Sequence, residues 1–140
     1  MVPLPCAVTS NNTMTPLIGT KVVDFSHVIA GPFATFYLSQ LGAEVTKVEA
    51  PGRGDMMRSL RSGETAFESL NSGKTLTLID IATPNGRQLA LDMAAKADVF
   101  VDNYRPGVLE RHGLGYSDVR SVNPRIVYCS ISAFGQEIGR

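Results

Sequence analysis

Hydrophobic and polar positions along the chain follow a repeating pattern, and its clearest stretch runs from residue 22 to residue 42. Residues 22–25 (VVDF) form a short, mostly apolar run typical of a buried strand, and Ser26 and His27 follow it as a polar turn. Beyond Gly31-Pro32 the apolar side chains recur at helical spacing. Proline suits the first position of a helix, because its missing N–H would have no partner there. The pattern predicts a strand, a tight turn and a helix in succession.

Four more strands are predicted further along the chain. The strands are expected at residues 44–49, 75–81, 98–103 and 125–132, and the helices between them at 83–96, 108–112 and 117–122. The long polar connection 52–74 is expected to be mobile or functional, with a short helix near residues 67–70. Five strands joined by helical crossovers predict an α/β fold with a parallel, doubly wound sheet.

The helix expected after the third strand has the most specific sequence signals. Thr83 is expected to cap it, because a threonine side chain accepts a hydrogen bond from the first turn. Leu89, Met93 and Ala97 are expected to share its buried face, because they recur at helical spacing.

The two ends of the chain lead to different expectations. Residues 1–16 lack the basic start and the long apolar core of a signal peptide, so they are expected to form a flexible tail, with residues 17–140 as the folded part. After the fifth strand, residues 134–136 begin a loop where another helix would follow, because a parallel sheet buries both faces. Residues 17–140 are therefore expected to form a truncated domain, in which elements that would cover the sheet are missing.

Composition favours an ordinary globular domain. The chain has 140 residues, 44% of them hydrophobic and 19% charged, and its 13 basic and 13 acidic residues cancel. This balance gives no argument for nucleic acid or a membrane surface as a partner, and no apolar run reaches the length of a membrane span. Cys6 and Cys129 lie far apart and fit no metal-binding spacing, which favours free thiols in a reducing cytoplasm.

The turn after the first strand is the first candidate for a binding site. Helix starts offer unpaired N–H groups, and open α/β sheets bind ligands beyond the carboxyl ends of their strands. A nucleotide-like ligand is therefore expected around residues 26–32. The dinucleotide fingerprint needs three glycines where Gly31 stands alone. Glu49 lies about where a ribose-binding acid would, and the simpler interpretation is a surface charge at the end of a strand.

Polar residues near the predicted strand ends are further candidates. His27 could hydrogen-bond a ligand, although a loop histidine is often only solvated. Tyr104, next to Asn103, could stack on a base, although an aromatic residue at a strand end is commonly just packed. Scattered basic residues on a neutral protein are usually solvated, but three near the predicted sheet edge have the charge to neutralise phosphates: Lys74, Arg105 and Arg111.

No arrangement in the sequence identifies a catalytic nucleophile. The chain has no Ser/His/Asp order, no metal-spaced cluster and no pair of carboxylates within one element. The four aspartates considered as possible nucleophiles lie in separate segments: Asp24, Asp55, Asp80 and Asp102. None of them has a recognisable activating partner in the sequence.

Five segments, taken in order, carry a resemblance to a known family. They are DFSHVIAGPFAT, LGAEVTKVEAPGRGD, LNSGKTLTLID, ADVFVDNYRPGVLERHGLGY and NPRIVYCSISAFGQ. Over about residues 17–136 the chain resembles the amino-terminal part of the family III CoA-transferases, a family that includes formyl-CoA and carnitine CoA-transferases and the alpha-methylacyl-CoA racemases. The resemblance implies a Rossmann-like large domain with CoA across its strand ends, a smaller second domain and an interlocked homodimer.

The resemblance also implies which residues meet CoA. By position they would be His27, Ala30, Lys74, Asn103, Tyr104, Arg105 and Arg111. An acyl-CoA and a carboxylic acid are implied as substrates, with no tightly bound cofactor and no metal. A basic residue that some members carry after the glutamate of the second strand is replaced by Ala50, so a phosphate contact from that point is missing.

The implied reaction is covalent, and the family's catalytic aspartate lies beyond the last residue of this chain, Arg140. Its carboxylate attacks an acyl-CoA thioester, gives a mixed anhydride and becomes an aspartyl-CoA thioester before transfer to the acceptor acid. The expected function is CoA transfer, with this chain supplying the CoA-binding part. Two alternatives stay open, a racemase-type isomerase and a non-catalytic truncated product, and the turn that contains His27 favours the transferase.

Overall fold

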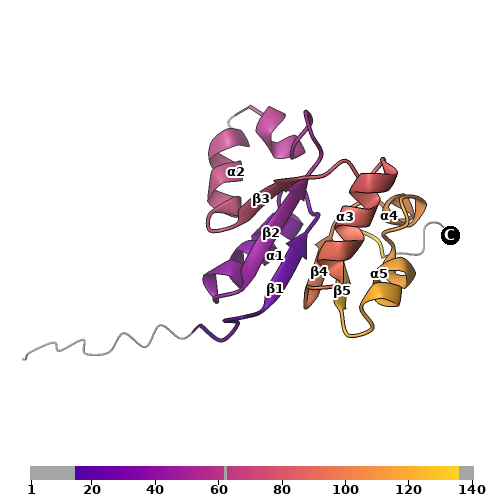
Figure 1. The fold of residues 1–140 in the computed structure, drawn as a ribbon. Coiled ribbons are helices and arrows are strands. Elements are labelled where there is room, and N and C mark those ends of the chain that lie inside the picture. The colour runs from indigo at the N-terminus through magenta and orange to yellow at the C-terminus, as the bar shows by residue number, and fades with distance from the viewer. Residues whose placement is uncertain (1–14, 62, 136–140) are drawn as a thin grey trace, which may run out of the picture.

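A computed structural model describes residues 15–61 and 63–135, and it shows a five-stranded parallel sheet with helices on both faces (Figure 1). The strands are β1 (Lys21–Asp24), β2 (Glu44–Glu49), β3 (Thr75–Leu78), β4 (Val99–Asp102) and β5 (Val127–Ser130). The helices are α1 (Ala30–Gln40), the 3-10 helix η1 (Met56–Ser59), α2 (Gly63–Asn71), α3 (Pro84–Ala94), α4 (Val108–Arg111) and α5 (Tyr116–Val122). The order across the sheet is β3-β2-β1-β4-β5, which is the Rossmann order and confirms the predicted doubly wound parallel sheet.

The side chains of β1 show why both faces of the sheet must be covered. Val23 and Phe25 pack in one hydrophobic cluster with residues of α3, α4 and α5, whereas Val22 packs in another with Leu38 of α1. In Figure 1, α3 lies in front of the sheet with α4 and α5 to its right, and α1 lies behind the sheet. Because successive side chains of a strand point to opposite faces, a central parallel strand is apolar at neighbouring positions rather than at every second one.

The connection between β2 and β3 is more regular than predicted. It contains η1 and the nine-residue helix α2, where the sequence predicted a mostly irregular stretch with a short helix near residues 67–70. Asp55 caps η1 by accepting a hydrogen bond from the N–H of Met57. Phe67 of α2 is buried, and the guanidinium of Arg58 lies 3.6 Å from its ring centroid. The helix predicted near residues 67–70 is confirmed and is longer than expected, whereas η1 was not predicted. The prediction relied on average polarity and did not anticipate the buried ring of Phe67.

Helix α3 confirms its predicted cap and part of its predicted buried face. Thr83 Oγ1 accepts a hydrogen bond from the N–H of Gly86 at 3.0 Å. Ala97, just after the helix, is buried, and Met93 packs against the same hydrophobic cluster, whereas Leu89 is 47% exposed. The helix itself buries Leu91 and three small residues, Gly86, Ala90 and Ala94. These small residues recur every four positions, so they let the helix axis approach the sheet closely.

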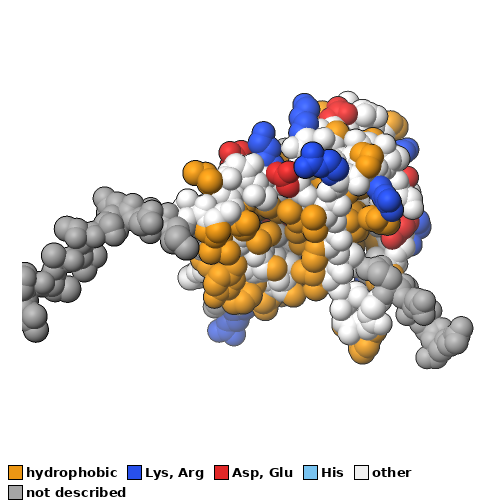
Figure 2. Space-filling view, turned by 90° about the horizontal axis from the view of Figure 1, so that it is seen from below, with side chains coloured by type: hydrophobic (Ala, Val, Ile, Leu, Met, Phe, Trp, Pro, Cys, Tyr) orange, Lys and Arg blue, Asp and Glu red, His pale blue; other side chains and the backbone are white. Residues whose placement is uncertain are grey.

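Hydrophobic side chains gather over a broad area of the molecule when it is seen from below (Figure 2). On the outer side of α1 and its flanks, large hydrophobic side chains recur every four residues and are 42–56% exposed: Ile29, Phe33, Tyr37 and Leu41. The rings of Phe33 and Tyr37 meet edge to face with their centroids 4.9 Å apart. Exposed apolar surfaces of this kind are typical of areas that other protein surface covers.

The structure bears on three features that composition raised, namely membrane spans, metal sites and cysteines. Within residues 15–61 and 63–135, no helix has the length and apolar character needed to cross a membrane. The same ranges contain no group of three or more acidic, histidine or cysteine side chains placed to hold a metal ion. Cys129 is exposed and free, whereas Cys6 and most of the predicted tail lie outside the described residues.

Candidate functional site

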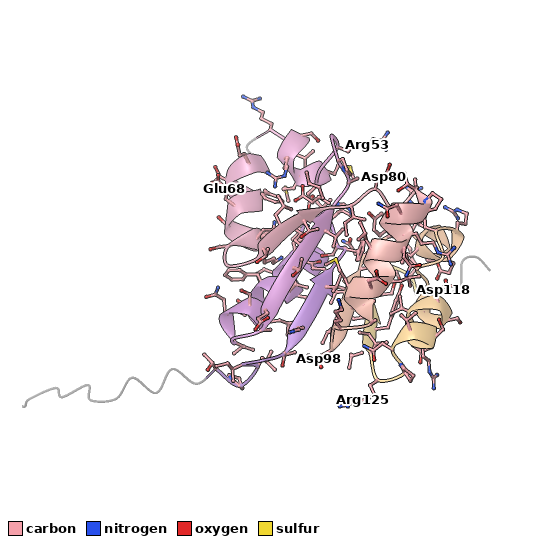
Figure 3. All side chains as sticks on the ribbon, in the orientation of Figure 1. Arg53, Glu68, Asp80, Asp98, Asp118 and Arg125 are labelled. Carbon is pink, nitrogen blue, oxygen red and sulfur yellow. The ribbon has the colours of Figure 1, made fainter. Side chains whose placement is uncertain are left out.

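The carboxyl ends of β1 and β4 are neighbours at the point where the strand order changes direction. The chain leaves β1 for α1 on one face of the sheet and leaves β4 for α4 on the other. Open α/β sheets bind their ligands at such a point. Figure 3 marks this end of the sheet, at the top, by Arg53 and Asp80, and the amino ends of the strands, at the bottom, by Asp98.

The structure brings together three predicted site residues at this point, namely His27, Asn103 and Tyr104. The side-chain amide of Asn103 accepts a hydrogen bond from the backbone N–H of His27 and donates one to its carbonyl, both at 2.7 Å. His27 Nε2 and Tyr104 Oη share a hydrogen bond of 2.7 Å, and the two rings meet edge to face. The turn after β1 is therefore fastened to the turn after β4.

Burial keeps this histidine–tyrosine pair uncharged. Burial lowers the pKa of His27 below its ordinary value, more than the charge of nearby Asp55 raises it. Burial, together with the charge of Asp102, raises the pKa of Tyr104 to about 12. Near neutral pH the pair therefore offers neutral hydrogen-bonding groups to a ligand.

The backbone that follows His27 has an unusual conformation. Val28 has a φ of +67°, in the left-handed region that β-branched residues rarely adopt. Helix α1 then begins at Ala30, so Pro32 occupies its third position rather than the first position that the sequence predicted. Among the described residues, no side-chain hydrogen bond caps this helix start, which leaves N–H groups of its first turn for a ligand.

Lys74 lies beneath this turn, with 1% of its side chain exposed. Its Nζ contacts Thr35 Oγ1 at 2.7 Å, Asn71 Oδ1 at 2.8 Å, the carbonyl of Pro32 at 2.9 Å and Asp24 Oδ2 at 3.1 Å. Burial lowers the pKa of Lys74, although the charge of Asp24 opposes this. Protein acceptors surround the ammonium, so the geometry favours a role in joining α1 and α2 to β1 over a phosphate contact.

A second buried ion pair joins Lys47 of β2 to Asp55 at 2.9 Å. Lys47 also donates to the carbonyl of Ser26 at 2.7 Å, and Asp55 Oδ1 accepts from the N–H groups of Val28 and Met57 at 3.0 and 2.9 Å. Burial acts to raise the pKa of Asp55, but the hydrogen bonds from Lys47 and from these two N–H groups hold it below its usual value. The Asp55 carboxylate therefore supports the turn in its charged form, paired with Lys47.

The interpretation of Glu49 as a surface charge was wrong. Glu49 is 2% exposed, and Arg58 donates to its two carboxylate oxygens at 3.1 and 3.3 Å. The sequence reasoning also missed Lys47, and it noted Asp24 and Asp55 without a partner. A usable signal was present, because a charge inside a Val-rich strand that is buried on both faces must have a partner.

The remaining predicted site residues, Ala30, Arg105 and Arg111, are exposed and follow the carboxyl ends of β1 and β4. Arg111 lies in α4, and its guanidinium reaches back toward Gly107, where an added Cβ would lie 3.4 Å from Nη1. Two cations are thus exposed on the segment that carries Asn103 and Tyr104. Of the seven predicted site residues, Lys74 alone has its charged group enclosed by protein acceptors, because the fold turns its side chain inward toward Asp24.

Replacing Asp102 with asparagine is expected to change how stability depends on pH. Asp102 is 3% exposed, and its Oδ1 accepts from the N–H of Tyr104 at 3.0 Å and from Ser130 Oγ at 3.2 Å. Burial raises the pKa of Asp102, more than these hydrogen bonds lower it. A carboxyl whose pKa is higher in the folded chain favours folding while it is protonated. That contribution is lost as pH rises from the unfolded pKa through the folded one.

Urea unfolding between about pH 4 and pH 8 measures this effect. The free energy of unfolding of Asp102→Asn, relative to the unmodified chain, is expected to increase as pH rises. Asp92→Asn, on the exposed side of α3, controls for the loss of one negative charge. A difference between Asp102→Asn and the unmodified chain that stays constant over this range would contradict the prediction.

Comparison with known proteins gives a consistent result. Residues 17–139 match one family model, described as CoA-transferase family III. The succinyl-CoA:glutarate CoA-transferase of Mus musculus is 45% identical over 130 residues, which cover 89% of this chain and 30% of that protein. The acetyl-CoA:oxalate CoA-transferase of Acetobacter aceti is 39% identical over 125 residues, which cover 86% of this chain and 32% of that protein.

A solved structure matches in the same way. The crystal structure of the hypothetical protein Rv3272 from Mycobacterium tuberculosis has a TM-score of 0.83 and 42% identity, over 89% of this chain and 34% of that one. The chain spans about one third of the length of these relatives. Because the family model extends over nearly all of the sequence that forms the sheet and its helices, the chain belongs to CoA-transferase family III.

Proposed function

We propose that this chain is the CoA-binding part of an enzyme that transfers CoA from an acyl-CoA to a carboxylic acid. The observation that carries the proposal is the fastened pair of turns at the switch point, where His27 is held by Asn103 and Tyr104. Open α/β sheets bind ligands at this point, and the relatives described above are named as transferases that act on CoA esters. Those names also support the transferase over the racemase-type alternative.

Different residues at this site would bind different parts of an acyl-CoA. The exposed guanidinium groups of Arg105 and Arg111 suit phosphate oxygens, and the uncapped start of α1 near Ala30 favours negative charge. The neutral pair of His27 and Tyr104 suits uncharged polar groups of the ligand. These roles position the thioester, and positioning of this kind supplies much of the rate gain in covalent acyl transfer.

The chemistry itself is assigned to a carboxylate that the family carries beyond the residues matched here. It attacks the thioester carbonyl, and the thiolate leaves to give a mixed anhydride. The released thiolate then attacks the enzyme-derived carbonyl of the anhydride, which forms the aspartyl-CoA thioester and frees the donor acid. The proposal includes an interlocked homodimer and a reducing cytoplasm as the setting. A non-catalytic product remains the alternative for a chain about one third as long as its relatives.

Isothermal titration calorimetry of the chain with CoA and with NAD tests the proposed ligand. Tighter binding of CoA is expected, because the turn holds Gly31 where the dinucleotide fingerprint needs three glycines, and because Arg105 and Arg111 are exposed beside the turn after β4. NAD bound as tightly as CoA would contradict the assignment.

Arg111→Ala is expected to weaken CoA binding by about 1 to 3 kcal/mol, the usual contribution of a charge-assisted hydrogen bond to a phosphate. Glu110→Ala, at the neighbouring exposed position of α4, is the matched control and should change the affinity little. The same calorimetry gives the dissociation constants. Equal affinities of Arg111→Ala and the unmodified chain would contradict the phosphate contact and would mean that Arg111 is only a solvated surface residue.

A further inference from the structure

Side chains from two other segments hold the backbone of the turn that follows β1. Lys47 donates to the carbonyl of Ser26 at 2.7 Å, and Asn103 bonds both the N–H and the carbonyl of His27. Asp55 accepts from the N–H of Val28 at 3.0 Å. Beyond the local hydrogen bonds of Ser26 to Asp24, side chains that are distant in sequence therefore hold the backbone of the turn.

The peptide group between His27 and Val28 is held at both of its polar atoms. Its carbonyl accepts from Asn103 Nδ2, and its N–H donates to Asp55 Oδ1. Asn103 follows β4 and Asp55 follows β2, so the two contacts come from different parts of the sheet edge. A peptide plane fixed at both polar atoms cannot rotate without breaking one of the two bonds.

Val28 needs such a restraint. Its φ of +67° is unfavourable for a β-branched side chain, and such residues persist only where the surrounding structure fixes them. Without the hydrogen bond to Asp55, the valine would gain by returning to extended backbone. That change would displace the His27 ring on one side and the start of α1 on the other.

Asp55 is well suited to supply the restraint. It is fully buried, and its Oδ2 forms the 2.9 Å ion pair with Lys47, which holds the carboxylate in its charged form. Its Oδ1 is shared by the N–H groups of Val28 and Met57, so the same oxygen that caps η1 also restrains the turn. A charged acceptor makes a stronger hydrogen bond to an N–H than a neutral one does.

We propose that Asp55 is a positioning residue for CoA binding, which holds Val28 in the left-handed conformation and thereby sets the positions of His27 and the start of α1. The inference rests on the proposed CoA site. It adds a residue that makes no direct contact with the ligand and acts through the backbone of Val28.

The test compares two variants, one that keeps a side-chain acceptor at position 55 and one that removes it. Removing Asp55 alone would leave Lys47 buried and unpaired, so both variants carry Lys47→Met. Lys47→Met/Asp55→Asn keeps an oxygen for the N–H of Val28, and Lys47→Met/Asp55→Ala removes it. A third variant adds Val28→Gly to the alanine variant, because glycine adopts a positive φ without a steric penalty.

Three measurements separate positioning from general stability. NMR gives the hydrogen-exchange protection and the HN–Hα coupling of residue 28, calorimetry gives the CoA affinity, and urea unfolding gives the stability. The asparagine variant is expected to protect the Val28 amide. The alanine variant is expected to lose this protection and to bind CoA about tenfold more weakly than the asparagine variant. Val28→Gly is expected to restore most of the affinity without restoring the stability.

Two outcomes would overturn the inference. One is an alanine variant with the same Val28 amide protection and the same CoA affinity as the asparagine variant. The other is an affinity that follows the stability in all variants and does not recover with Val28→Gly. If no variant and not even the unmodified chain binds CoA, the proposed function fails, while the Val28 amide data still decide whether Asp55 fixes the turn.

Val28→Gly in the unmodified chain provides a test that leaves the ion pair intact. Because Asp55 still holds the backbone, CoA affinity is expected to stay within about threefold of the unmodified chain. A loss of about tenfold or more would show that the valine side chain matters rather than the backbone conformation, and would overturn the inference.

Discussion

Replacing Lys74 with methionine is expected to lower the free energy of unfolding by about 3 to 5 kcal/mol, the usual cost of leaving one partner of a buried ion pair alone. Asp24 is fully buried, and the ammonium of Lys74 lies 3.1 Å from its Oδ2. Asp24 would keep its hydrogen bonds from Ser26 and Thr35, but no cation would balance its charge at this contact. Urea unfolding at neutral pH measures the loss.

Two controls identify the source of this loss. Asp24→Asn/Lys74→Met removes both charges and should recover part of the stability, because no lone charge is left buried. Lys96→Met, on the exposed surface, should change the stability by less than about 0.5 kcal/mol. Unchanged stability with weaker CoA binding in Lys74→Met would instead support the phosphate contact that the family resemblance implies for Lys74.

Gly31→Ala is expected to destabilise the chain by about 1 to 3 kcal/mol or more, although alanine is the better helix former by roughly 0.5–1 kcal/mol. Gly31 lies in the first turn of α1. A Cβ built there would lie 2.1 Å from Ser26 Cβ and 2.4 Å from Ser26 Oγ. Steric overlap therefore outweighs helix propensity. The turn that carries His27 would have to move, so CoA affinity should fall together with the melting temperature.

A double-mutant cycle isolates the collision. Ser26→Gly removes the two nearest atoms, at the cost of the hydrogen bond from Ser26 Oγ to Asp24. Adding Gly31→Ala to Ser26→Gly should cost less stability than adding it to the unmodified chain. Equal costs in the two backgrounds would mean that the close approach of α1 to the turn is not what requires glycine at this position.

The sequence by itself determined the five strands, most of the helices and the class of fold. The second strand was predicted at residues 44–49, and β2 has these bounds, because β-branched residues between Gly42 and the turn at Pro51-Gly52 are a local signal. The Thr83 cap of α3 was equally local, since donor and acceptor are three residues apart. The alternation of strands and helices then allowed little besides a parallel, doubly wound sheet.

Part of the candidate site was also accessible from the sequence. His27, Asn103 and Tyr104 follow strands, and the carboxyl ends of parallel strands meet at one edge of the sheet. The direct contacts of His27 with both other residues could not be predicted. They span 76 and 77 positions of sequence and depend on β1 and β4 being neighbours.

Tertiary structure alone decided which charges are exposed. In the sequence Lys74 and Arg105 are both basic residues beside turns, yet Lys74 meets Asp24 across 50 residues while Arg105 is exposed. Glu49, Asp55 and Lys47 likewise became buried partners. A charge enters the interior only where the fold brings an opposite charge or several hydrogen bonds to it, because the desolvation penalty is otherwise too large. Those partners are defined by strand order and helix packing, which no local pattern of residues specifies.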